Sequence, residues 1–181
     1  AEDDAVDLYV NFLLTTIDQR LDGMKIVLDC ANGAAYKTAP KVYEALGAEV
    51  ITIGCDPNGI NINDNIGSTH PELLQKTVVE SGADIGMAYD GDADRLIVVD
   101  EKGMIIDGDK TICICAKMLK DAGQLAENKV TATVMSNIGF HKYIKEQVGA
   151  VVDVTGVGDR YVLESMLETG CVLGGEQSGH I

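Results

Sequence analysis

The sequence has few basic residues. Its 181 residues include 14 Lys and Arg against 29 Asp and Glu, which gives a formal net charge of −15 at pH 7. Proteins that bind a nucleic-acid backbone need clustered Lys and Arg, so this composition argues against a nucleic-acid partner. The chain also lacks an apolar run of the roughly 20 residues that cross a bilayer, and we predict no membrane association. Hydrophobic residues still make up 46% of it, enough for one good core or two modest ones.

The five cysteines lack the C-x-x-C spacing of zinc knuckles and redox motifs. They are Cys30, Cys55, Cys113, Cys115 and Cys171. An odd number, mostly inside apolar runs, favours free thiols buried in a reducing compartment, and we predict a cytoplasmic protein. The sequence also shows no signal peptide and no initiator Met, and it stops inside a glycine-rich stretch. We therefore expect a piece of a longer protein.

Hydrophobic periodicity predicts an α/β fold. Over residues 3–20 apolar side chains recur every three or four positions, as on one face of an amphipathic helix. Further along, short apolar runs alternate with helical segments that end at glycines, which is the strand–helix–strand unit of a parallel sheet. Strands are predicted at 24–28, 49–53, 85–88, 96–99, 130–135 and 151–154, and helices at 38–46, 71–81, 110–119 and 140–147.

The two halves of the chain resemble each other. At an offset of 102 residues, four positions of the first half match four of the second: Glu44, Gly47, Ala48 and Val50 pair with Glu146, Gly149, Ala150 and Val152. This similarity predicts two tandem, related α/β domains with mixed, largely parallel sheets, the second truncated, joined near Asp107 and Gly108. The alternative is that any two such units share a glycine after the helix.

Three carboxylates alternate along the acidic loop, residues 90–95, between two predicted strands. Asp90, Asp92 and Asp94 can converge on one hard cation, and oxygen-only ligands favour Mg²⁺ or Ca²⁺ over zinc. An EF-hand is excluded, because its sixth position needs glycine and this chain has Arg95 there. The remaining alternative is an acidic surface turn. We predict a magnesium site here, with Arg95 holding a phosphate or tying down a carboxylate.

The glycine-rich loop, residues 174–180, carries further polar groups. Glu176 can accept hydrogen bonds from sugar hydroxyls, Ser178 can donate or accept, and His180 can donate to a hydroxyl or a phosphate. An ordinary glycine-rich turn is the alternative.

A second loop, residues 155–160, stands between a predicted strand and a helix, as a phosphate-binding loop would. A dinucleotide fingerprint is excluded, because Tyr161 occupies the place of its third glycine. Asp159 and Arg160 remain candidate substrate contacts, with a local salt bridge as the alternative for Arg160.

The acidic loop, Asp-Gly-Asp-Ala-Asp-Arg, resembles the D-G-D-x-D-R metal motif of the α-D-phosphohexomutase family, and residues 175–180 are similar to its G-E-x-S-G-H sugar loop. The similarity continues at residues 29–34, which resemble the opening of the family's second domain. Residues 57–63 and the Val-Gly-Asp-Arg-Tyr run at 157–161 resemble the branch that acts on glucosamine phosphates. This resemblance covers essentially the whole chain.

The resemblance implies a domain organisation. Residues 1–20 would be a helix that leads from the family's first domain, residues 21–107 the second domain with the metal loop, and residues 108–181 an incomplete third domain with the sugar loop. The first and fourth domains would then be partners of this chain within one protein.

The resemblance also implies an activity, the interconversion of glucosamine 6-phosphate and glucosamine 1-phosphate with Mg²⁺ as cofactor. In this family a phosphoserine of the first domain phosphorylates the sugar, and the resulting bisphosphate returns its other phosphate. Arg95 would support catalysis, Glu176, Ser178, Asp159 and Arg160 would bind the hexosamine phosphate, and His180 would bind it or act in catalysis. Because this chain has no phosphoserine motif of that family, we expect it to be inactive alone. The alternatives are a phosphomannomutase/phosphoglucomutase and a non-catalytic cation-binding module.

Overall fold

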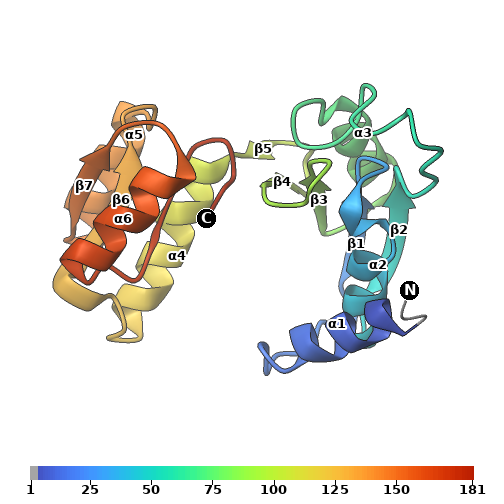
Figure 1. The fold of residues 1–181 in the computed structure, drawn as a ribbon, viewed down its shortest axis with the longest axis horizontal. Coiled ribbons are helices and arrows are strands. Elements are labelled where there is room, and N and C mark those ends of the chain that lie inside the picture. Colours follow the sequence, from blue (N-terminus) through green and yellow to red (C-terminus); the bar gives the residue numbers. More distant parts are fainter. Residues whose placement is uncertain (1–3) are drawn as a thin grey trace. The chain divides into compact units, whose positions relative to one another are not determined.

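The computed structural model describes residues 4–181, so residue 3, where the predicted first helix starts, lies outside the described range. The chain divides into two compact units, the first ending at Ile105 and the second comprising Ile106–Ile181. Each unit has its own sheet and its own helices (Figure 1). The predicted class, two tandem α/β units with largely parallel sheets, is confirmed.

The first unit is built on a five-stranded sheet in the order β2-β1-β3-β4-β5. β1 pairs in parallel with β2 and β3, and β3 pairs antiparallel with β4. The bounds of its elements are α1 Ala5–Leu14, β1 Lys25–Asp29, a 3₁₀ turn Ala34–Tyr36, α2 Thr38–Ala45, β2 Glu49–Ile53, α3 Glu72–Ser81, β3 Ile85–Tyr89, β4 Leu96–Asp100 and β5 Ile105–Ile106.

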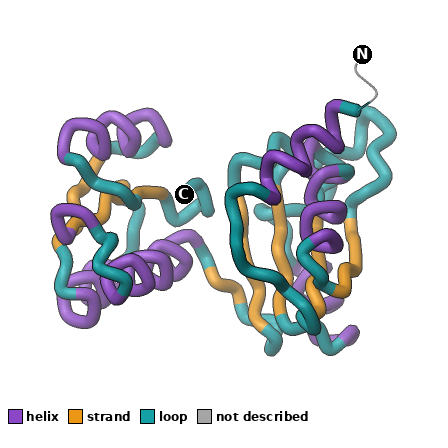
Figure 2. The backbone as a smooth tube through the Cα atoms, turned by 90° about the horizontal axis from the view of Figure 1, so that it is seen from below, coloured by secondary structure: helices purple, strands orange, loops and turns teal. Residues whose placement is uncertain are grey.

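Successive side chains of β1 point to opposite faces of the sheet, and helices cover both faces. Ile26 and Leu28 pack with Ala39 of α2, whereas Val27 packs with Leu74 and Val78 of α3. All three strand residues are fully buried, so β1 is an interior strand of a three-layer unit, flanked by β2 and β3. Figure 2 shows the strands in orange and the helices in purple.

The second unit has a three-stranded parallel sheet in the order β7-β6-β8. Its core contains Ile112 of α4, Val130 of β6, Phe140 of α5 and Ile144 of the turn that follows α5. The bounds are α4 Gly108–Asp121, a 3₁₀ turn Ala126–Asn128, β6 Lys129–Thr133, α5 Ile138–Tyr143, a π-helical turn Ile144–Val148, β7 Val151–Thr155, α6 Asp159–Thr169 and β8 Gly174–Gly175.

The prediction of one helix over residues 3–20 is wrong at its C-terminal end, because α1 stops at Leu14. The hydroxyls of Thr15 and Thr16 donate to the carbonyls of Phe12 and Leu13, at 2.7 Å each. Threonine side chains that bond to nearby carbonyls compete with helix continuation.

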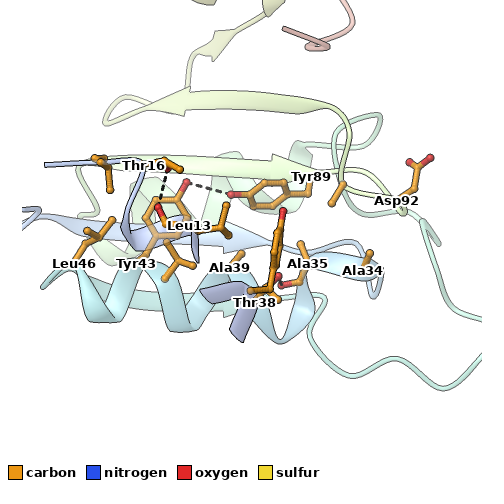
Figure 3. A pocket seen from close by; sticks show the side chains of 14 residues that line it. Leu13, Thr16, Ala34, Ala35, Thr38, Ala39, Tyr43, Leu46, Tyr89 and Asp92 are labelled. Carbon is orange, nitrogen blue, oxygen red and sulfur yellow. Dashed lines mark hydrogen bonds between the residues drawn. The ribbon is translucent and has the colours of Figure 1, made fainter. Parts of the chain in front are cut away.

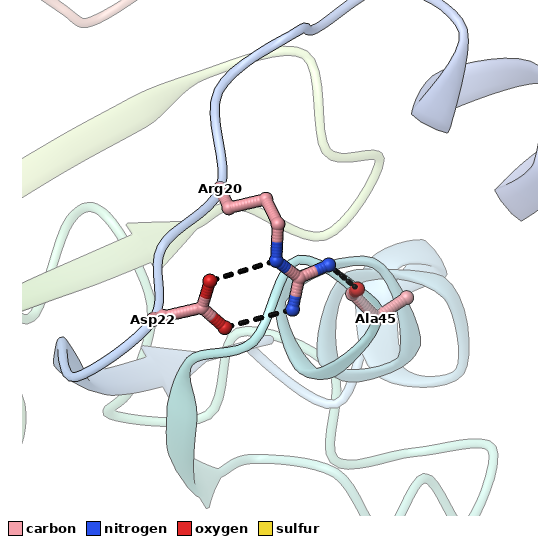
Figure 4. Close-up of polar contacts among 3 residues, drawn as sticks. All are labelled: Arg20, Asp22 and Ala45. Carbon is pink, nitrogen blue, oxygen red and sulfur yellow. Dashed lines mark hydrogen bonds and ion pairs between the residues drawn. The ribbon is translucent and has the colours of Figure 1, made fainter.

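The segment after α1 is fastened instead by Arg20. Its guanidinium donates to both carboxylate oxygens of Asp22, at 2.7 and 2.8 Å, and to the carbonyl of Ala45 at the end of α2 (Figure 4). The hydrogen bond from Arg20 holds the pKa of Asp22 below its usual range. This non-helical segment therefore lies against the C-terminal end of α2.

Other boundaries differ by a few residues. β6 ends at Thr133 and not at 135, and α5 begins at Ile138, where the side chain of Asn137 accepts from the backbone N–H of Phe140 and caps the helix. The short strands β5 and β8 were not predicted. Among the described residues, no helix is both long and apolar enough to cross a membrane.

All five cysteines are free thiols in the structure. Cys30 and Cys171 are buried and the other three are partly buried. Burial raises the pKa of Cys113 to about 11, with the charges of Asp109 and Asp107 adding to the effect.

The two faces of α3 allow a test of the packing. Leu74 is fully buried and Leu73 is 44% exposed. Leu74→Ala should lower the free energy of unfolding by about 2–5 kcal/mol, because it leaves a cavity in the core, whereas Leu73→Ala should cost less than about 1 kcal/mol. Urea denaturation measures both. Equal losses would contradict this assignment of the buried face.

Candidate functional site

The acidic loop connects β3 to β4, two adjacent antiparallel strands whose pairing ends at Tyr89 and Leu96. This short connection brings the three predicted ligands together. Asp90, Asp92 and Asp94 each offer one carboxylate oxygen, and these oxygens lie within 4.8 Å of one another. The cluster therefore has the spacing that one cation would require.

Asp90 is the fixed member of this cluster. Its side chain is buried, and both of its oxygens are occupied by Arg95: the backbone N–H donates to Oδ1 at 3.1 Å and Nε donates to Oδ2 at 2.6 Å. Burial alone would raise the pKa of Asp90, but the hydrogen bonds and the charge of Arg95 hold it below its usual range. Of the two roles predicted for Arg95, the structure shows that it ties down a carboxylate.

Asp92 and Asp94 are exposed, in contrast to Asp90. Arg95 Nε lies 3.5 Å from an Asp94 oxygen, so the guanidinium also orients this second carboxylate. The donor set is three carboxylates, the hard oxygen ligands that Mg²⁺ prefers, and Mg²⁺ commonly keeps further positions for water or substrate phosphate. The residues present therefore fit a magnesium ion.

A cavity of about 570 Å³ adjoins the acidic loop within the first unit, with Asp92 and Ala93 among its lining residues. Figure 3 shows Asp92 at one end of it and a pair of tyrosines, Tyr43 and Tyr89, farther along. The tyrosine hydroxyls lie 3.1 Å apart, and burial raises the pKa of both. Sequence reasoning missed this pair, because the two residues are 46 positions apart and belong to no motif.

In the second unit, the loops after β6, β7 and β8 lie at one edge of the sheet, because the three strands are parallel. The glycine-rich loop and the 155–160 loop touch there: the backbone N–H of Gly158 donates to Glu176 Oε1 at 2.9 Å. The glycine-rich loop is closed by the Glu176 N–H, which donates to the carbonyl of His180 at 2.8 Å. The structure thus joins two segments that the sequence presents separately.

Only some of the predicted sugar-binding residues lie together in the structure. Asp159, Glu176 and His180 line one cavity of about 420 Å³ in the second unit. Ser178 is exposed on the loop and is not part of that lining. Arg160 points its guanidinium at Glu164, one helical turn along α6, with a distance of 2.8 Å from Nε to Oε1. In the structure, Arg160 therefore makes a local salt bridge, which was the alternative to a substrate contact.

Two family models match this chain, and each covers most of one unit. The alpha/beta/alpha domain II of phosphoglucomutase/phosphomannomutase matches residues 7–103, and domain III matches residues 107–181. The chain therefore belongs to the phosphoglucomutase/phosphomannomutase family, the phosphohexomutases.

Curated relatives and solved structures agree with this assignment. Phosphoglucosamine mutase of Desulforamulus reducens is 56% identical over 179 residues, which cover 99% of this chain and 40% of that protein. The phosphoglucosamine mutase of a Thermoanaerobacter species is 60% identical over 173 residues, 96% of this chain and 38% of its own length. This chain thus spans about 40% of the length of such relatives.

Among solved structures, a phosphoglucomutase/phosphomannomutase family protein of Burkholderia thailandensis matches with a TM-score of 0.83 at 30% identity, over 96% of this chain and 38% of that one. N-acetylphosphoglucosamine mutase of Aspergillus fumigatus, solved with GlcNAc-6P and magnesium, has a TM-score of 0.71 at 23% identity and covers 88% of this chain and 33% of its own. At this level of identity, the similarity to the Aspergillus protein shows a shared fold only.

Replacing Arg95 with methionine tests how Asp90 is held. A carboxyl whose pKa is lowered on folding stabilises the folded state above its unfolded value of roughly 4, and this contribution is lost as the pH falls through the lowered value. We expect Arg95→Met to be less stable than the parent at pH 7, with the difference shrinking toward about pH 3. Urea denaturation across this range measures it.

The matched control is Arg160→Met, which removes an exposed arginine from an i, i+4 pair in the second unit. It should change stability little at any pH, because exposed pairs contribute little. A stability loss in Arg95→Met that is the same at both ends of the pH range would contradict the described pairing with Asp90.

Proposed function

We propose that this chain forms the magnesium-binding and sugar-binding domains of a phosphoglucosamine mutase, which interconverts glucosamine 6-phosphate and glucosamine 1-phosphate. The observation that carries the proposal is the cluster of Asp90, Asp92 and Asp94 with Arg95 fixed on Asp90. This cluster lies in a chain that matches domains II and III of the family. Relatives at 54–60% identity that are named phosphoglucosamine mutase support the choice of sugar.

Asp90, Asp92 and Asp94 would hold the metal. A bound Mg²⁺ supplies positive charge that polarises the transferring phosphoryl group and offsets the charge that develops on its oxygens. Arg95 keeps Asp90 ionised and oriented before any metal arrives, since it bonds to both oxygens of that carboxylate. The Aspergillus relative solved with magnesium supports this choice of cation.

Glu176 is the proposed ligand of the sugar hydroxyls. Its carboxylate lines the cavity of the second unit, and the bond from Gly158 leaves its second oxygen available as an acceptor. Hydrogen bonds from neutral hydroxyls to a carboxylate are stronger than those to neutral acceptors. Asp159 and His180 line the same cavity, and we assign them to the sugar or its phosphate, with Ser178 on the exposed part of the loop.

The phosphate donor is assigned to a segment outside these 181 residues. The α-D-phosphohexomutases use a phosphoserine of their first domain, and the family matches of this chain are to domains II and III. The first and fourth domains are accordingly its proposed partners within one longer protein. On this proposal the 181 residues bind metal and substrate but do not turn substrate over.

Magnesium binding can be tested on the chain itself. Asp92→Asn should bind Mg²⁺ at least about tenfold more weakly than the parent, because it removes a charged ligand. Isothermal titration calorimetry measures the affinity. The control is Asp18→Asn, which removes the same charge from an exposed position outside the loop and should bind like the parent. If Asp92→Asn also bound like the parent, the proposed site would be wrong.

Sugar recognition is tested in the full-length protein that contains this chain. Glu176→Gln keeps an acceptor for Gly158 but loses the charge, so kcat/KM for glucosamine 6-phosphate should fall roughly ten- to a hundredfold, the loss expected for a charged hydrogen bond. Glu164→Gln, on the exposed pair with Arg160, is the control. Preferential turnover of mannose 6-phosphate by the parent would instead favour a phosphomannomutase/phosphoglucomutase.

A further inference from the structure

Gly91, between the metal ligands Asp90 and Asp92, is confined on two sides. On one side lies Gly33: a Cβ atom built there would be 2.3 Å from the Gly91 carbonyl oxygen, and the neighbouring Ala34 N–H donates to that oxygen at 2.8 Å. The path of the acidic loop is therefore set in part by a segment some sixty residues earlier in the chain.

The second side of Gly91 is closed by the asparagine-rich loop, residues 56–70. A Cβ atom built on Gly91 would lie 2.7 Å from Asn63 Nδ2 and 2.7 Å from Ile62 Cδ1. The asparagine-rich loop is itself tied to the end of β3, because the Ser68 N–H donates to the Tyr89 carbonyl at 2.9 Å. Two segments remote in sequence thus hold the backbone of the acidic loop between them.

Both segments are fastened to one buried carboxylate, that of Asp29 at the end of β1. Its Oδ1 accepts from the Ala31 N–H at 2.9 Å, in the turn that leads to Gly33, and its Oδ2 accepts from the Gly67 N–H at 2.8 Å, in the asparagine-rich loop. The side chain is fully buried. The Asp29 carboxylate therefore bonds to both walls of the acidic loop.

The local backbone shows why such an anchor is needed. Ala31 and Asn32 have φ values of 53° and 49°, and Asn63, whose N–H donates to the Ala31 carbonyl, has 57°. Residues other than glycine persist in this left-handed region only when their surroundings over-determine them. Burial raises the pKa of Asp29, while the two backbone hydrogen bonds oppose that rise. The buried carboxylate accepts a backbone hydrogen bond from each of these two segments.

We propose that Asp29 is a positioning residue for the magnesium site, acting through the turn at 30–33 and the asparagine-rich loop on Gly91. The inference rests on the magnesium binding proposed above. Asp29 makes no contact with the cation and sets its affinity by fixing the spacing of Asp90 and Asp92. Removing a partner that orients metal ligands typically weakens binding about ten- to a hundredfold.

The experiment compares two isosteric variants of the 181-residue chain. Asp29→Asn places an amide NH₂ against a backbone N–H and should weaken Mg²⁺ binding about tenfold or more in a calorimetric titration. The matched control is Asp109→Asn in the second unit, since Asp109 is equally buried and accepts from the backbone and side-chain nitrogens of Asn137, both at 2.8 Å. It should lower the melting temperature but leave Mg²⁺ affinity within about twofold of the parent.

The possible outcomes separate this role from general destabilisation. A folded Asp29→Asn with the parent's affinity, beside an impaired Asp92→Asn, would overturn the role of Asp29 alone. Equal weakening in Asp109→Asn would also overturn it, because loss of stability would then explain both. If Asp92→Asn binds like the parent, the proposed metal site itself is wrong and the inference fails with it.

A further variant decides the matter if Asp29→Asn does not fold. Gly33→Ala leaves the buried carboxylate in place and pushes a methyl group against the Gly91 carbonyl oxygen. It should lower Mg²⁺ affinity about tenfold in a chain with an intact fold. Parent-like affinity in Gly33→Ala would show that the turn does not set the loop, and the proposal would be overturned.

Discussion

The ion pair between the buried carboxylate of Asp90 and the partly exposed guanidinium of Arg95 is the interaction on which the candidate site depends. A carboxylate out of water is costly unless it is paired and hydrogen-bonded, and Arg95 meets both conditions with its backbone N–H and its guanidinium. The pair closes the connection between β3 and β4. As a result the Asp90 carboxylate is held inside the fold, while Asp92 and Asp94 remain exposed.

The supporting structure reaches back to the first strand of the sheet. β1 is an interior strand with helices on both faces, and its last residue, Asp29, fastens two loops that confine Gly91. The carboxyl ends of parallel strands commonly carry the functional loops of α/β folds. The second unit follows the same rule with different chemistry, because the loops after β7 and β8 meet through Gly158 and Glu176. Related architectures thus present a candidate metal site in one unit and a candidate hydroxyl-binding site in the other.

Much of the fold could be predicted because its signals are local. The strand at 49–53 was predicted at its observed bounds, and α3 ends before Gly82, which has the left-handed φ of 63° that favours glycine there. β8 could not be predicted, because it consists of Gly174 and Gly175. Close packing leaves no room for a side chain here, because a Cβ atom on Gly174 would be 2.6 Å from Met166 Sδ of α6. Since glycine has no side chain, a strand made of two glycines shows no hydrophobic pattern from which it could be predicted.

Part of the candidate site could likewise be predicted from the sequence, and part could not. The alternation of Asp90, Asp92 and Asp94 is visible in the sequence, whereas the anchoring role of Asp29 depends on contacts to Ala31 and Gly67 that only the folded chain shows. Whether the acidic loop binds a divalent cation can be decided with a crystal of this chain soaked with Mn²⁺ as a stand-in for Mg²⁺. We expect an anomalous-scattering peak among the oxygens of Asp90, Asp92 and Asp94. A well-ordered acidic loop without such a peak would contradict it.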